Sequence, residues 1–191
     1  LFPYTTLFRS ALSLMGDEYF KQNYRPLLPD IQQLTYNDVS ELEKISCRTA
    51  AVVVEPIQAE SGVTMPDVEF MQLLQARCRE TGTLLIVDEA QTAFGRTGKL
   101  FGFEHFGITP DILLLAKAFG GGMPLGAFIA DKCIMQCLTE NPVLGHITTF
   151  GGHPVCCAAG QAALNVLLHE NWIAEAQEKG DLFKKLLVHP A

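Results

Sequence analysis

An acid and a lysine each follow one of the most apolar stretches of the sequence. Asp88 comes directly after the run LLIV, with Glu89 beside it, and Lys117 comes directly after ILLLA. A lysine at the end of such a run stands where an ammonium group is costly to bury. Desolvation would lower the pKa of this amine and make it a better nucleophile. The simpler alternatives are a helix N-cap or surface acid for Asp88 and a lysine at a loop rim for Lys117.

The acid and the lysine together indicate a cofactor that acts as an electron sink. A lysine can hold an aldehyde as a Schiff base, and a carboxylate can keep a pyridine nitrogen protonated. The three glycines at 120–122, shortly after Lys117, would let the backbone approach a ligand closely.

Short apolar runs alternate with helical patterns and predict the elements that would position these two residues. We expect strands at 50–56, 83–90, 111–117 and 126–130, and helices at 66–82, 154–169 and 172–188, with Gly180 interrupting the last helix. The run 50–56 is typical of a strand covered on both faces. Strand, helix, strand predicts an α/β fold with a largely parallel sheet. Ligands of such sheets bind at the carboxyl ends of the strands, where Asp88 and Lys117 lie.

Composition narrows the class of protein. The 191 residues carry a net charge of −7, which argues against nucleic acid or an anionic membrane as the main partner. No apolar run has the length needed to span a bilayer. The six cysteines form no CxxC pair, so we expect free thiols in a reducing cytoplasm. The five histidines lack the spacing of metal ligands, and we expect no metal site.

The first ten residues, LFPYTTLFRS, look unlike the rest of the chain. They lack the features of a secretory signal or a mitochondrial presequence. Back-translated in frame, they resemble a common sequencing-library adapter. We therefore expect residues 1–10 to be a non-native scar and the natural sequence to start at Ala11.

Three ordered segments of the chain resemble the class III aminotransferases, which use pyridoxal phosphate on the fold-type I scaffold. The longest is LLIVDEAQTAFGRTGKLFGFEHFGITPDILLLAKAFGGGMPLGA, and EPIQAESGV (55–63) and TTFGGHPVCCAAG (148–160) flank it in the family's order. The resemblance covers nearly everything from Ala11 onward. It implies the large domain of that scaffold, a mostly parallel sheet sandwiched by helices.

The resemblance implies a role for each matching residue. Lys117 would form the Schiff base with the cofactor and then move the proton between the substrate carbon and the cofactor, while Asp88 would keep the pyridine nitrogen cationic. Gln91 would bond the phenolic oxygen, and Ala90 would lie against the ring. Thr149 would reach the cofactor phosphate of a partner subunit, which implies a homodimer or a larger assembly.

The resemblance also bears on the substrate. Gln91 and the EPIQ segment favour the acetylornithine, ornithine and 4-aminobutyrate side of the family. Glu60 resembles the acid that engages a substrate-recognising arginine in the ornithine branch. We expect transfer of a terminal amino group, as in N-acetylornithine or ornithine, to 2-oxoglutarate. The alternative is a 4-aminobutyrate or other omega-amino acid transaminase.

The family pattern also predicts how the chain is organised. Residues 11–165 would be the central part of the cofactor-binding large domain, and residues 166–191 a helical segment leading toward a small C-terminal domain. We expect a fragment truncated at both ends, without the phosphate-cradling loop and the carboxylate-binding arginine, and therefore inactive by itself.

A rival interpretation comes from a different class of protein. LLIVDEAQ also resembles the Walker B strand of a nucleotide-driven helicase, in which an apolar strand ends in Asp-Glu. No GxxxxGK[ST] motif precedes it, and GRTGKL follows the acidic pair instead. The negative charge also argues against a nucleic-acid motor.

Overall fold

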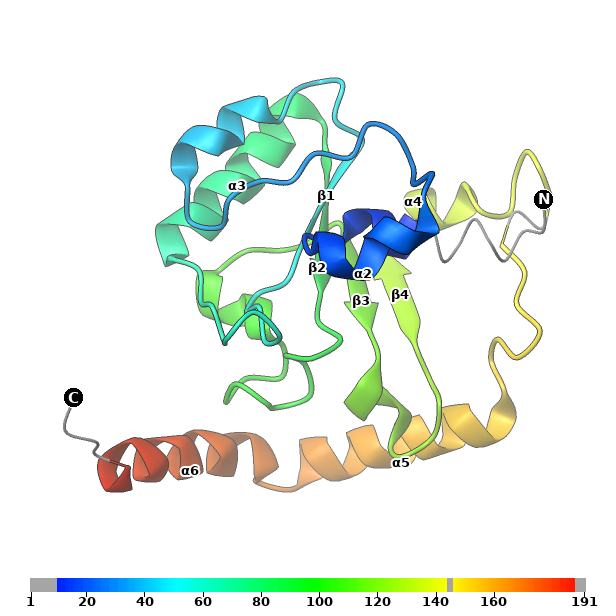
Figure 1. Cartoon of the computed structure of the whole chain (residues 1–191). Coiled ribbons are helices and arrows are strands. Elements are labelled where there is room, and N and C mark those ends of the chain that lie inside the picture. The colour runs from blue at the N-terminus through cyan, green and yellow to red at the C-terminus, as the bar shows by residue number, and fades with distance from the viewer. Residues whose placement is uncertain (1–9, 144–145, 188–191) are drawn as a thin grey trace.

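The computed structural model describes residues 10–143 and 146–187, which form a four-stranded sheet with helices around it (Figure 1). The strands are β1 (Ala51–Val54), β2 (Leu84–Asp88), β3 (Ile112–Leu115) and β4 (Ala127–Ala130). The α-helices are α2 (Glu18–Lys21), α3 (Val68–Thr81), α4 (Lys132–Gln136), α5 (Pro154–His169) and α6 (Trp172–Leu186), after a short helix at 10–14. Four 3-10 helices are η1 (Gln22–Tyr24), η2 (Val39–Lys44), η3 (Gly102–Phe106) and η4 (Lys117–Gly120).

The sheet has the strand order β1-β2-β3-β4. The first three strands run parallel, and β4 pairs antiparallel with β3. Val54 pairs with Val87, and Asp88 pairs with Leu114, so the first three strands end at one edge of the sheet. The predicted α/β fold with a mostly parallel sheet is confirmed, and each predicted strand is present in a somewhat shorter form.

Helix α3 covers one face of the sheet and supplies much of the core. Phe70, Leu74 and Cys78 recur every four residues and are buried, whereas Leu73 is 38% exposed. The helix ends at Gly82, whose φ of 71° is the left-handed conformation that glycine adopts freely. The core also contains Leu42, Ile45, Val54, Met71, Leu85, Val87, Phe106 and Ile108.

The opposite face of the sheet is more open. Val54 is 9% exposed, but its neighbour Val53 points the other way and is 37% exposed. The prediction that the run 50–56 is covered on both faces is therefore wrong for this chain, because the helix that follows it in sequence packs on one side only.

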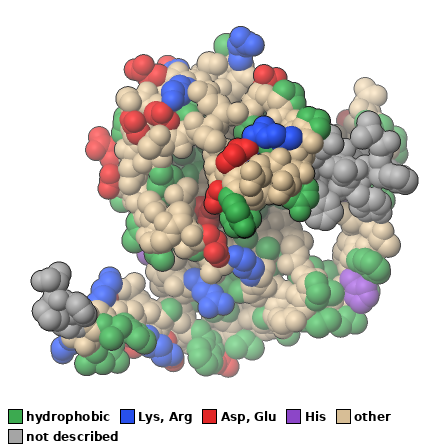
Figure 2. Space-filling model, viewed as in Figure 1, with side chains coloured by type: hydrophobic (Ala, Val, Ile, Leu, Met, Phe, Trp, Pro, Cys, Tyr) green, Lys and Arg blue, Asp and Glu red, His purple; other side chains and the backbone are tan. Residues whose placement is uncertain are grey.

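The last two helices follow one another below the sheet (Figure 1). Helix α6 continues through Gly180 to Leu186, so the predicted interruption is wrong. An exposed glycine lowers helix stability by about 1 kcal/mol, which is too little to end a helix by itself. Apolar side chains remain exposed along both helices: Val155, Val166, Leu168, Trp172, Leu182, Phe183 and Leu186. Figure 2 shows hydrophobic side chains along the lower edge of the molecule.

Some predictions fall partly outside the described residues. Of the segment 1–10, only Ser10 is described, at the start of the helix at 10–14, and residue 188 lies beyond the described end of α6. The division at 165/166 falls inside α5 and stays a prediction. Within residues 10–143 and 146–187, no helix is long and apolar enough to cross a membrane.

Candidate active site

Charged side chains follow each of the three parallel strands. Glu55 comes after β1, Asp88 is the last residue of β2, and Lys117 begins η4 two residues after β3. The register of the sheet brings these positions to one edge, and the backbone amide of Glu89 donates to the carbonyl of Leu114 at 3.0 Å. The structure therefore brings together the acid and the lysine that the sequence singled out, at the edge where α/β sheets bind ligands.

Asp88 is half-buried and is locked to the backbone that follows it. Its Oδ1 accepts a hydrogen bond from the amide of Ala90 at 2.9 Å. This turn leaves the second carboxylate oxygen available to another donor. Asp88 sits at the start of a turn, in agreement with its simpler interpretation as a cap. Asp88 and Lys117 are both close enough to Glu55 for their charges to shift the pKa of its carboxyl.

Lys117 is exposed, so the prediction that its amine is buried and desolvated is wrong for this chain. The lysine comes after the end of β3, on the rim of the sheet and outside the core. Its φ of 51° is a left-handed conformation that side chains other than glycine adopt at a cost of about 1–3 kcal/mol. Strain of this kind is typical of functional positions, where the surrounding structure holds one residue in place.

The side chain of Gln91 contacts the Lys117 amine. Lys117 Nζ donates a hydrogen bond to Gln91 Oε1, across 26 residues of sequence. The amide nitrogen of Gln91 still has two hydrogens with which to donate to a ligand. The structure thus groups three of the predicted site residues, Asp88, Gln91 and Lys117, together with Ala90, which is half-buried beside them.

Glu55 is a titratable group of this edge to which the sequence analysis gave no role. Burial raises the pKa of its half-buried carboxyl, and the negative charge of Asp88 raises it further, while Lys117 lowers it. These influences place Glu55 within electrostatic reach of both groups. The signal that could have found it is the one that found the other two, a charged residue directly after an apolar strand.

The remaining two predicted site residues lie apart from this group. Glu60 is exposed in the loop after β1, which is closed by a bridge between Gln58 and Thr64. Its negative charge makes a small contribution to the raised pKa of Glu55. Thr149 is exposed in the segment before α5 and has no described contact with Asp88 or Lys117.

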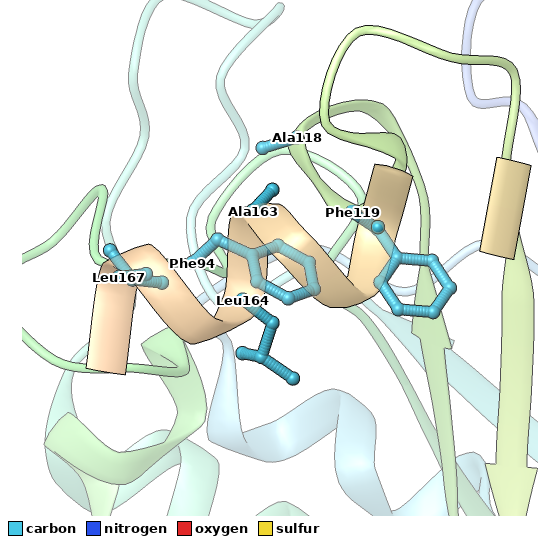
Figure 3. A pocket seen from close by; sticks show the side chains of 7 residues that line it. Phe94, Ala118, Phe119, Ala163, Leu164 and Leu167 are labelled. Carbon is cyan, nitrogen blue, oxygen red and sulfur yellow. The ribbon is translucent and has the colours of Figure 1, made fainter. Parts of the chain in front are cut away.

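The turn that carries Lys117 rests on α5. A β-carbon on Gly160 would lie 2.7 Å from the carbonyl oxygen of Phe119, so only glycine lets this turn and the helix touch. The rings of Phe94 and Phe119 stack with centroids 5.6 Å apart. Figure 3 shows both rings beside α5, where they line a small apolar cavity of about 160 Å³ together with Ala118, Gly160, Ala163, Leu164 and Leu167.

This cavity has no charged side chain and supports the site without forming part of its chemistry. The described part of the chain also holds no group of three His, Cys, Asp or Glu residues that could bind a metal ion. All six cysteines are described, and all are free thiols. The groups available for chemistry at this edge are therefore an amine, carboxylates and an amide.

The sequence was compared with protein families and with individual proteins. The family described as Aminotransferase class-III matches residues 7–190. A [LysW]-aminoadipate semialdehyde/glutamate semialdehyde transaminase of Sulfurisphaera tokodaii is 44% identical over 177 residues, which are 93% of this chain and 45% of that protein.

Solved structures give the same answer. The ornithine aminotransferase of Toxoplasma gondii ME49 matches with a TM-score of 0.85 and 36% identity over 92% of this chain and 42% of that one. An (S)-enantioselective omega-transaminase of Thermomicrobium roseum matches with a TM-score of 0.82 and 33% identity over 92% of this chain and 44% of that one. The chain thus spans less than half the length of each of these relatives.

These matches decide between the two interpretations of LLIVDEAQ. The Walker B interpretation is wrong, because the family match includes this strand and nearly the whole chain around it. The order of the segments, the sheet and the grouped lysine, acid and amide all agree with the other interpretation. The chain belongs to the class III aminotransferase family.

Proposed function

We propose that the protein is a pyridoxal-phosphate-dependent aminotransferase that acts through Lys117 and Asp88. The observation that carries the proposal is the meeting of Lys117, Gln91 and Asp88 at the carboxyl ends of adjacent parallel strands. Class III aminotransferases use pyridoxal phosphate, and a solved ornithine aminotransferase of Toxoplasma gondii, crystallized with oxidized glutathione, has partial occupancy of this cofactor at its active site.

The residues present fit this cofactor. Pyridoxal phosphate offers an aldehyde, a ring nitrogen and a phenolic oxygen, and the site holds an amine, a carboxylate and an amide. Lys117 is exposed, so its amine is accessible to an aldehyde. Asp88 uses one oxygen on the Ala90 amide, which leaves the other for the protonated ring nitrogen.

Each residue then has a distinct task. When bound, the cofactor supplies an electron sink for the negative charge that develops on the amino-bearing carbon of the substrate. Lys117 binds the aldehyde and later moves a proton at that substrate carbon. Asp88 holds the proton on the ring nitrogen. Gln91 donates to the phenolic oxygen from its amide nitrogen while its amide oxygen orients Lys117.

The proposed amino donor carries a terminal amine. The Sulfurisphaera tokodaii relative is named for semialdehydes, which are what remains when a terminal amine of a diamino acid is transferred. Another solved relative, from Plasmodium falciparum, is named an ornithine delta-aminotransferase, after the same kind of amine. We propose a donor of the ornithine or N-acetylornithine type, with 2-oxoglutarate as acceptor. Glu60 would act in donor recognition through an arginine.

A second candidate is a broader omega-amino acid transaminase, such as a 4-aminobutyrate transaminase. The likeness to the Thermomicrobium roseum omega-transaminase, at 33% identity, favours it. The two candidates share the lysine, the acid and the terminal amine. All three donors carry a carboxylate at the other end. The candidates differ in whether the donor must also carry a free or acetylated amino group on the carbon next to that carboxylate, which a donor panel measures.

We also propose that Thr149 binds the cofactor phosphate of a second subunit in a homodimer. The exposure of its side chain supports a role outside its own site. Sedimentation of the full-length protein, together with the cofactor affinity of Thr149→Ala, tests this point. A monomer with full cofactor affinity would contradict it.

The experiment on the main proposal uses the full-length protein with pyridoxal phosphate. Ornithine, N-acetylornithine, 4-aminobutyrate and lysine are offered as donors with 2-oxoglutarate or pyruvate, and the aldehyde and amino acid products are quantified. We expect the highest kcat/KM with ornithine or N-acetylornithine and 2-oxoglutarate. A preference for 4-aminobutyrate would select the second candidate.

Lysine variants provide the control. Lys117→Ala should abolish both turnover and the visible absorption band of the lysine-bound cofactor. Lys132→Ala removes an equally exposed lysine from α4 and should change neither. A full absorption band in Lys117→Ala, or no turnover of any donor by the wild-type protein, would refute the proposed function.

A further inference from the structure

Glu89 is a fully buried carboxylate that the proposed chemistry does not use. It directly follows Asp88, the last residue of β2. Its exposed fraction is 0%. No ion pair in the described part of the chain involves Glu89. A buried charge is costly unless hydrogen bonds satisfy it, so the stability of the fold depends on the hydrogen-bond donors around Glu89.

Both oxygens of Glu89 are hydrogen-bonded, and the two donors lie at opposite ends of one loop. The hydroxyl of Thr92 donates to Oε2, and the backbone amide of Phe103 donates to Oε1 at 2.7 Å. Bonds to a charged acceptor are roughly twice as strong as those between neutral groups. The carboxylate therefore closes the loop from residue 90 to residue 102 at its base.

The surroundings of this carboxylate are closely fitted. A β-carbon on Gly102 would lie 3.2 Å from Glu89 Oε2, 3.1 Å from Thr92 Cβ and 3.2 Å from Pro56 Cβ. The amide of Ala93 also donates to the carbonyl of Glu89 at 3.2 Å. Glu89 thus has little freedom to move, and neither has the backbone that it bonds.

Gln91 lies inside this closed segment. Its backbone is held on one side by the bond from the Ala90 amide to Asp88 and on the other by the bond from Thr92 to Glu89. Its side chain is exposed, so packing does little to fix it, yet it contacts the Lys117 amine. The orientation of Gln91 therefore depends on how firmly residues 90–92 are held.

We propose that Glu89 is a positioning residue that, by clamping Thr92 and Phe103, holds Gln91 against Lys117 and the phenolic oxygen of the cofactor. The proposal rests on the proposed function, since it assigns Glu89 a task in the same site. It requires the side chain at position 89 to be hydrogen-bonded to both Thr92 and Phe103, and it gives the negative charge of Glu89 no direct part in the reaction.

Two variants separate the clamp from the charge. In Glu89→Gln the amide oxygen still accepts from the Phe103 amide, and the Thr92 hydroxyl can rotate to accept from the new amide nitrogen. In Thr92→Val the hydroxyl is lost while the branched shape is kept. Thr109→Val is the matched control, because Thr109 is exposed and no hydrogen bond of its hydroxyl is described.

The readout is a pH titration of the visible absorption band of pyridoxal phosphate bound to the full-length enzyme. Gln91→Ala should move the midpoint of this titration by about one to two pH units, the effect of one hydrogen bond to a charged oxygen. Thr92→Val should move it in the same direction. Adding Thr92→Val to Gln91→Ala should cause no further movement, because both act through one contact. Glu89→Gln and Thr109→Val should titrate like the wild type.

Several results would overturn the proposal. They are an unchanged midpoint in Thr92→Val, a Thr92→Val shift that adds fully to that of Gln91→Ala, and a Glu89→Gln shift as large as that of Thr92→Val. If Lys117→Ala retains the band, the proposed function fails and this role fails with it. If Lys117→Ala loses the band and Thr92→Val titrates normally, only the role of Glu89 is refuted.

Discussion

Replacing Gly160 by alanine tests whether α5 supports the turn that carries Lys117. A β-carbon at this buried position would lie 2.7 Å from the carbonyl oxygen of Phe119 and 2.8 Å from Cδ2 of Leu125. Real β-carbons essentially never approach other atoms within 3.0 Å, so something must shift. The leucine side chain can rotate away, but the carbonyl belongs to η4 and can move only with the turn.

The size of the effect follows from two opposed contributions. Alanine is favoured over glycine in a helix by about 1 kcal/mol. Overpacking a tight contact costs about 1–3 kcal/mol. We therefore expect the free energy of unfolding of Gly160→Ala to fall by about 1 kcal/mol. Because a misplacement of about 1 Å can reduce a rate about a hundredfold, we expect kcat/KM to fall by about tenfold to a hundredfold.

Gly180→Ala is the matched control. Gly180 lies in α6, and a β-carbon there would meet nothing within 4 Å. This variant should gain about 0.5–1 kcal/mol of stability and keep its activity. Urea-induced unfolding and kcat/KM, both measured on the full-length protein, compare the two substitutions. Equal stabilisation of both variants, with unchanged kcat/KM in Gly160→Ala, would refute the idea that α5 positions the Lys117 turn.

Three further predictions concern ionisable groups. Asp88→Asn should keep the hydrogen bond from the Ala90 amide and bind pyridoxal phosphate, yet lose most turnover, because a neutral amide cannot hold the ring nitrogen protonated. A kcat close to that of the wild type would mean that Asp88 only caps the turn. Burial, and then the charge of Asp88, raises the pKa of the Glu55 carboxyl. Glu55 therefore contributes to the free energy of unfolding at low pH, where its carboxyl is protonated, and this contribution is lost as the pH rises through the raised pKa. Glu55→Gln should therefore gain stability relative to the wild type as urea unfolding is moved from pH 4 to pH 7, and a constant difference would contradict this. Burial, and then the charge of Asp111, raises the pKa of Cys78 to about 11. At pH 8, iodoacetamide should therefore label the exposed Cys47 well before the buried Cys78, as measured by mass spectrometry of the labelled peptides. Earlier labelling of Cys78 would contradict this.

Local sequence patterns were enough to predict most of the elements. The runs AVVV, LLIVD, ILLL and AFIA are short and apolar and became the four strands, because such runs are buried most easily in a sheet. Gly82 ended α3 because its left-handed φ is open to glycine without strain. The same patterns predicted that Asp88 and Lys117 would stand at strand ends, since position relative to an apolar run is a local property.

Local sequence patterns did not correctly predict how deeply individual residues are buried. Lys117 was expected to be desolvated and is exposed, and Val53 was expected to be covered and is 37% exposed. Burial depends on which elements pack on a given face, and one run of residues contains no information about that. Gly180 was expected to interrupt a helix, but the helical hydrogen bonds on both sides of it outweigh its weak propensity.

The sequence by itself determined which residue types stand at the ends of the apolar strands, and this was enough to indicate the chemistry. Only the tertiary structure decided which of them meet. The parallel register of β2 and β3 places Asp88 beside Leu114, and the loop clamped by Glu89 returns Gln91 to Lys117 across 26 residues. Residues so far apart in sequence approach one another because strand pairing and buried hydrogen bonds join distant segments, and that joining is a property of the whole fold.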